Sequence, residues 1–105
     1  MSESKTERLS KHDQYVEELY RKIKGKYDSV SKHVPVRAKK RLLAEVDILA
    51  SKAGRTDLYE VKCSPRIAKA KRQLKKLSKY LASININKLY FYCGSSGSLV
   101  SVVLK

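Results

Sequence analysis

Two short stretches decide the fold, LLAEVDILA at residues 42–50 and LYEVKC at residues 58–63. In both stretches charged residues are interleaved with apolar ones, which is the period-two pattern of a β-strand. The segment between them, residues 51–57, contains Gly54 and is predicted to be a hairpin loop. The two stretches therefore predict an antiparallel hairpin.

The charged residues of this hairpin fall on matching sides of its strands. Period-two geometry places Glu45 and Asp47 on one side of the first strand, and Glu60 and Lys62 on one side of the second. We expect the apolar residues to share the opposite side, beneath a helix: Val46, Ile48, Tyr59, Val61 and Cys63. An exposed hairpin would show the same alternation. The two motifs together, followed by a basic helix, favour a functional site.

Helices and strands are predicted on both sides of the hairpin. An apolar face at three- and four-residue spacing predicts a helix over residues 8–25, and a weak alternation predicts a strand over 28–36. Ser64 and Pro65 are typical of a helix start, and that helix should run to Ser83. Two apolar strands follow, at residues 88–93 and 99–104.

The resulting order, α-β-β-β-α-β-β, predicts an α/β fold. The helix between residues 63 and 88 forms a strand–helix–strand crossover, which usually makes its two strands parallel. We therefore expect one small domain over residues 1–105, with a mixed central sheet flanked by helices and a flexible terminus at residues 1–8. Nothing in the sequence is long and apolar enough to span a bilayer, so an intracellular protein without a membrane partner is expected.

The charge distribution indicates a polyanionic partner. The net charge is +14, and no acidic residue follows Glu60. A basic protein of this kind most often binds nucleic acid. The candidate DNA-binding residues lie in a connector at residues 37–41, which could also be a solvated loop, and on the helix after the hairpin. They are Arg37, Lys39, Lys40, Arg41, Arg66, Lys69, Arg72, Lys76 and Lys79.

The clustered carboxylates predict a metal site. Asp47 and Glu60 would repel each other unless a divalent cation lay between them, and Mg²⁺ often binds one or two carboxylates together with water and phosphate. Glu45 is either a further metal ligand or a partner for Arg41. Lys62 could orient the attacking water or stabilise a charged transition state. These residue types suit phosphodiester hydrolysis with Mg²⁺, or with Mn²⁺ in its place.

The pattern of Asp47 followed by Glu60-Val61-Lys62 resembles the core motif of the PD-(D/E)XK nuclease superfamily, and among its members most resembles the archaeal Holliday junction resolvases. The resemblance covers roughly residues 10–95. It implies a restriction-endonuclease-like core, metal binding by Asp47 and Glu60, and catalysis by Lys62. It also implies an acid on the first helix, best matched by Glu18 with Glu17 as the rival, and a glutamine on the next helix, matched by Gln73. The proline of the motif's name is absent, since Val46 precedes Asp47.

The functional expectation is thus a metal-dependent DNA endonuclease acting on branched or junction DNA. A repair or restriction-type nuclease for ends, flaps or single strands, and a non-catalytic basic DNA-binding protein, remain alternatives. A homodimer is expected because the last two strands carry much apolar surface, from Leu89, Phe91, Val100, Val102 and Leu104. His12 and His33 are isolated in the sequence and are interpreted as solvated or structural. Cys63 and Cys93 are interpreted as small buried hydrophobic residues.

Overall fold

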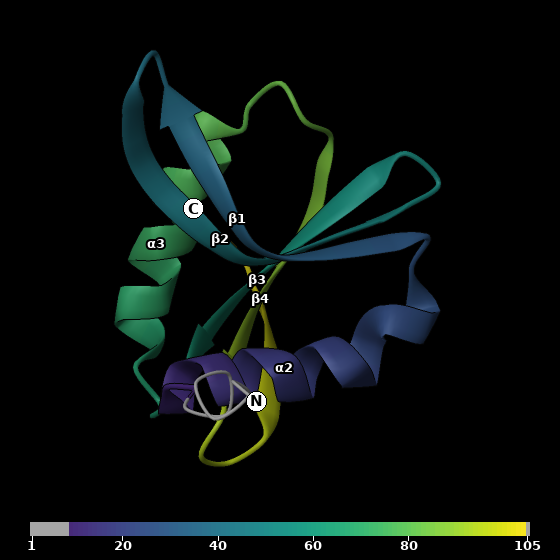
Figure 1. Cartoon of the computed structure of the whole chain (residues 1–105), viewed down its shortest axis with the longest axis vertical. Coiled ribbons are helices and arrows are strands. Elements are labelled where there is room, and N and C mark those ends of the chain that lie inside the picture. Colours follow the sequence, from purple (N-terminus) through teal and green to yellow (C-terminus); the bar gives the residue numbers. More distant parts are fainter. Residues whose placement is uncertain (1–8, 105) are drawn as a thin grey trace, which may run out of the picture.

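The computed structural model describes residues 9–104, so the terminus at residues 1–8, expected to be flexible, lies outside the described part. Two helices and five strands follow one another there in the predicted order (Figure 1). They are α2 (Lys11–Ile23), β1 (Ser29–Ala38), β2 (Arg41–Lys52), β3 (Arg55–Lys62), α3 (Ile67–Tyr80), β4 (Ile86–Cys93) and β5 (Ser98–Val102), with a turn of 3-10 helix, η1 (Lys24–Lys26), after α2.

The strands form one mixed sheet in the order β1-β2-β3-β4-β5. β1, β2 and β3 are antiparallel neighbours, β3 and β4 are parallel, and β5 returns antiparallel to β4. The helix α3 is the crossover between the two parallel strands, as its length and position in the sequence predict. The predicted α/β class, element order and mixed sheet are therefore confirmed.

Apolar residues are buried on both sides of the sheet. One cluster packs Ala70, Leu74 and Leu77 of α3 against the sheet, and the other does the same for Val16 and Leu19 of α2. The two helices thus cover opposite faces, and Figure 1 shows α2 running across the bottom of the view with α3 at the left. A sheet covered by helices on both faces therefore has no fully solvated side.

The expectation that all apolar hairpin residues share one side is wrong. Val46 packs in the α3 cluster, whereas Ile48 and Tyr59 pack in the α2 cluster. The alternation changes at His33 of β1, a non-glycine residue with φ of 53°, in the left-handed region. β1 pairs with β2 on both sides of this point, at Lys32–Ile48 and Val34–Val46, so the ladder continues. Val30 packs with the α2 cluster and Val34 with the α3 cluster, so both strands change sides at the same place.

The turns are tighter than the sequence suggested. The loop expected at residues 51–57 is reduced to Ala53 and Gly54, with φ of 53° and 80°, which is the backbone of a two-residue type I′ hairpin turn. The connector expected at residues 37–41 is likewise mostly strand, and only Lys39 and Lys40 form its turn.

The expected start of the second helix is also wrong. α3 begins at Ile67, after Arg66, and Ser64 does not cap it. The helix ends at Tyr80 rather than at Ser83. By contrast, Ser10 does cap α2, because its Oγ accepts a hydrogen bond from the Asp13 N–H at 3.1 Å.

The last two strands expose less apolar surface than expected. Phe91 and Val102 are buried, and exposed large apolar side chains in this region are Leu99, Val100 and Val103. The homodimer stays a prediction, and the exposed apolar surface that supports it is smaller than the sequence indicates. Within residues 9–104, no helix is both long enough and apolar enough to cross a membrane.

Candidate active site

Asp47 lies where β2 and β3 separate. The two strands pair from Lys52–Arg55 as far as Ile48–Tyr59, and the ladder stops one residue before Asp47. The N–H of Val61 therefore lies beyond the backbone ladder with β2, and it donates instead to the side chain of Asp47, at Oδ2, over 2.8 Å. The Asp47 side chain is only 7% exposed. The carboxylate is thus held in place by the backbone of the strand that carries the other predicted site residues.

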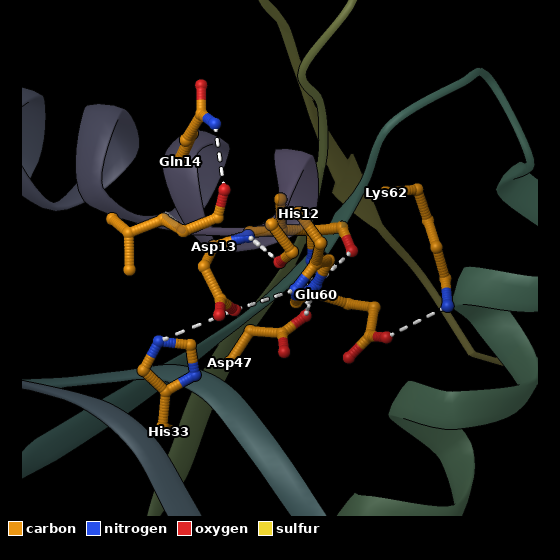
Figure 2. Close-up of polar contacts among 10 residues, drawn as sticks. His12, Asp13, Gln14, His33, Asp47, Glu60 and Lys62 are labelled. Atoms are coloured by element: carbon orange, nitrogen blue, oxygen red, sulfur yellow. Dashed lines mark hydrogen bonds and ion pairs between the residues drawn. The ribbon is translucent and has the colours of Figure 1, made fainter. Parts of the chain in front are cut away.

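Glu60 and Lys62 complete the group that the sequence predicted. Lys62 Nζ lies 3.3 Å from Glu60 Oε2, and both side chains are largely buried. Burial, and after it the negative charge of Asp47, raise the pKa of Glu60 to about 7, although Lys62 and His12 act in the opposite direction. Figure 2 shows the side chains of Asp47 and Glu60 next to each other, consistent with the effect of the Asp47 charge on Glu60. Asp47, Glu60 and Lys62 therefore form one compact cluster (Figure 2).

The structure adds His12 to this cluster. Its Nε2 lies 3.3 Å from Asp47 Oδ2 and 3.1 Å from the Val61 carbonyl oxygen, both of which are acceptors. This ring nitrogen must therefore carry a proton. The hydrogen bond to Asp47 is the largest cause raising the pKa of His12, to about 9, so the ring is a cation at neutral pH.

A second pair of residues extends the cluster towards β1. Asp13 Oδ1 lies 3.5 Å from His12 Nδ1 and 3.9 Å from His33 Nε2, as Figure 2 shows. Sequence reasoning missed both histidines. One signal was available for His12, which precedes Val16 by four residues and so shares the buried stripe of α2. No comparable signal exists for His33, whose position depends on its own left-handed backbone conformation in β1.

Each carboxylate keeps one oxygen free for a cation. Asp47 Oδ2 accepts hydrogen bonds from Val61 and His12, and Glu60 Oε2 faces Lys62, whereas Asp47 Oδ1 and Glu60 Oε1 have no protein partner in the described chain. Neither free oxygen is sealed from solvent, because Ser78 Oγ is the only fully buried side-chain polar atom without a partner within residues 9–104. Two accessible carboxylate oxygens fit Mg²⁺, which retains several waters when it binds proteins.

The larger ligand set expected from the sequence is not assembled. Across residues 9–104, no three His, Cys, Asp or Glu side chains are grouped to hold a metal. Glu18 instead accepts a hydrogen bond from the Tyr92 hydroxyl at 3.2 Å, and Glu17 pairs with Lys32. Glu45 is exposed on β2 and forms no ion pair with the described residues.

Gln73 has no confirmed role in the cluster. The residue is half-buried on α3 and forms no hydrogen bond within the described chain. Its neighbours on that helix, Ala70, Leu74 and Leu77, pack into the core. The structure therefore neither links Gln73 to the carboxylates nor gives it another partner.

All nine predicted DNA-binding residues are exposed, and none forms an ion pair within residues 9–104. They lie in two regions. Arg37, Lys39, Lys40 and Arg41 gather at the tip of the β1–β2 hairpin, and the other five lie at the start of α3 and along it. Both regions carry positive charge that nearby acids leave uncompensated, which is favourable for binding phosphates.

Comparison with known proteins gives no relative: no protein-family model matches the chain, and no curated protein is significantly similar to it.

Proposed function

We propose that the protein is a metal-dependent nuclease that hydrolyses phosphodiester bonds in DNA. The observation that carries this proposal is the buried Asp47–Glu60 pair, with one accessible oxygen on each carboxylate and the Lys62 ammonium beside it. Burying two like charges side by side is unfavourable unless a cation compensates them. The hydrogen bond from Val61 accounts for Asp47 in structural terms, but it gives no reason for a second buried carboxylate at Glu60.

The residues have distinct roles in this proposal. Asp47 and Glu60 would hold Mg²⁺ or Mn²⁺, which supplies neutralisation of phosphate charge and activation of water. Lys62 lies at hydrogen-bonding distance from Glu60 and presents a positive charge to the negative charge that develops on the phosphate. His12 and the Val61 amide hold Asp47 in one orientation. The exposed cations of the hairpin tip and of α3 would bind the flanking phosphates.

Branched DNA is the substrate that we propose. The resemblance to junction resolvases supports it, as does the division of exposed cations between the hairpin tip and α3. Contacts with phosphates position a protein on DNA but do not recognise the base sequence. Separate basic regions would therefore favour a DNA shape over a base sequence.

A cleavage assay on plain duplex, flap, single-stranded and four-way-junction DNA tests the proposal. We expect cleavage with Mg²⁺ or Mn²⁺ and none with EDTA. Asp47→Asn and Lys62→Ala should abolish cleavage while DNA binding persists, and Lys88→Ala, an exposed lysine on β4, is the matched control. Glu45→Ala tests whether this exposed acid contributes. An Asp47→Asn protein that cuts at the wild-type rate would refute the site assignment.

A non-catalytic DNA-binding protein is the second candidate. The observation that favours it is that no third ligand is grouped with Asp47 and Glu60 among the described residues, where a third ligand would strengthen metal binding. Calorimetric titration with Mg²⁺ and Mn²⁺ separates the two candidates. Binding that disappears in Asp47→Asn supports the nuclease, and DNA binding without any metal binding supports the alternative.

A further inference from the structure

A groove lies on the flank of α3, away from the carboxylate cluster. Its volume is about 780 Å³, and it runs between the C-terminal half of α3 and the residues that follow β5. Its apolar and aromatic floor is formed by Leu104 and Tyr80, and Tyr80 is 40% exposed. Figure 1 shows the C-terminus beside α3, at the left of the view.

The rim of this groove is strongly basic. Its charged lining residues are all cations, with no acid among the described residues: Arg72, Lys75, Lys76 and Lys79. A second hollow of about 290 Å³ continues it along Val103, which is 67% exposed, and Lys71. Lys76 Nζ also lies 5.9 Å from the centre of the Tyr80 ring. The groove therefore combines an aromatic and apolar floor with a line of positive charge.

We propose that this groove binds an unpaired strand of nucleic acid. Duplex DNA stacks its bases inside and offers mainly phosphates, so it would use the cations and leave the floor exposed. An unpaired strand offers both phosphates and base faces, and base stacking on an aromatic side chain is independent of sequence. A second copy of the chain would bring the same cations to the same rim, which opposes self-association there.

The position of the groove connects it with the candidate active site. α3 begins five residues after Lys62 and has 14 residues, so it spans about 20 Å at about 1.5 Å per residue. A strand bound beside Tyr80 would reach the carboxylates over about six stacked nucleotides, at roughly 3.4 Å each. This part of the inference rests on the proposed nuclease function. It makes the preferred substrate a duplex that carries a single-stranded branch.

The binding test uses fluorescence anisotropy, with EDTA present and with Asp47→Asn protein, so that cleavage plays no part. The probes are a labelled oligothymidylate and an abasic oligonucleotide of equal length and charge. We expect the abasic strand to bind roughly 5- to 100-fold more weakly, because it lacks the stacking contribution. In the same background, Tyr80→Ala should bind both probes equally and Tyr80→Phe should retain the difference. Leu42→Ala, an exposed apolar residue at the hairpin tip, should also retain it.

Several results would overturn the inference. Equal binding of the two probes by the Asp47→Asn protein would show that bases do not contact the groove. Tighter binding of a Glu- and Leu-rich peptide than of oligothymidylate would identify an acidic protein segment as the occupant. If Tyr80→Ala fails to fold, the abasic comparison and Tyr80→Phe still decide the question. Absence of cleavage by the wild-type protein with Mg²⁺ or Mn²⁺ would refute the nuclease function without affecting these binding results, so the two failures are distinguishable.

Discussion

Glu60→Gln should stabilise the metal-free protein at alkaline pH. Burial and the Asp47 charge raise the pKa of Glu60 to about 7 in the folded state, above its ordinary value near 4.5. Between these pH values the unfolded chain loses a proton that the folded chain keeps. The free energy of unfolding therefore falls as pH rises from about 4.5 to about 7. Above pH 7 it stays lower by the whole of this amount.

The size of the effect follows from the two pKa values. At about 1.36 kcal/mol per pH unit, the interval from 4.5 to 7 corresponds to roughly 3 kcal/mol. Glutamine has nearly the same shape and does not ionise, so the variant should escape this loss. It should match the wild type near pH 4.5 and exceed it by about 1–3 kcal/mol near pH 8.

Urea denaturation followed by circular dichroism, in EDTA and across this pH range, measures the difference directly. Glu45→Gln, which removes an exposed acid from β2, is the control and should follow the wild-type curve. Saturating Mg²⁺ should stabilise the wild type, by about 2.7 kcal/mol at a concentration 100 times its Kd, and leave Glu60→Gln unaffected. Parallel pH curves for the wild type and Glu60→Gln would refute the reasoning.

Three further predictions concern other parts of the molecule. Gly94→Ala should destabilise the protein by about 1–3 kcal/mol in denaturant melts, because a methyl group there would overlap a tyrosine ring of α2, whereas Gly25→Ala, with nothing nearby, should be tolerated. Lys39→Ala combined with Lys40→Ala should flatten the dependence of log affinity on log salt by about 0.9 for each phosphate that these lysines neutralise, and an unchanged slope would place DNA elsewhere. The stabilisation from His12 is complete below its ordinary pKa of 6.5 and disappears as pH rises through about 9. His12→Ala should remove that part of the pH profile, and a stability profile identical to the wild type would exclude the hydrogen bond to Asp47.

The strand positions and the central trio could be predicted from the sequence because local alternation encodes them. Asp47, Glu60 and Lys62 come together on two neighbouring strands, and strand alternation is a property of nearby residues. The prediction of sidedness failed because the alternation changes at His33, where a left-handed backbone residue interrupts β1. The residues around position 33 show no pattern that predicts this left-handed conformation.

The acid expected on the first helix shows a different limit. The resemblance favours Glu18 by its position in a helix, but which acid reaches the β2–β3 separation depends on how the helix docks. In the structure the start of α2 lies over the β2–β3 separation, which brings His12 and Asp13 to the site and leaves Glu18 beside Tyr92. Helix docking depends on packing between distant segments, and a single sequence does not specify it. The same holds for the groove beside α3, which needs Leu104 and Tyr80 to meet.

The bond between the Val61 N–H and Asp47 Oδ2 also constrains how this sequence can change. The carboxylate replaces a missing ladder partner, so position 47 needs a hydrogen-bond acceptor even in a protein that no longer cuts DNA. Asparagine satisfies the amide with its oxygen but then turns its NH₂ group towards the place of the cation. A lineage that abandoned catalysis could thus keep the fold through asparagine, and regain activity by one codon change. Alanine would instead leave the buried Val61 N–H unpaired and destabilise the fold itself.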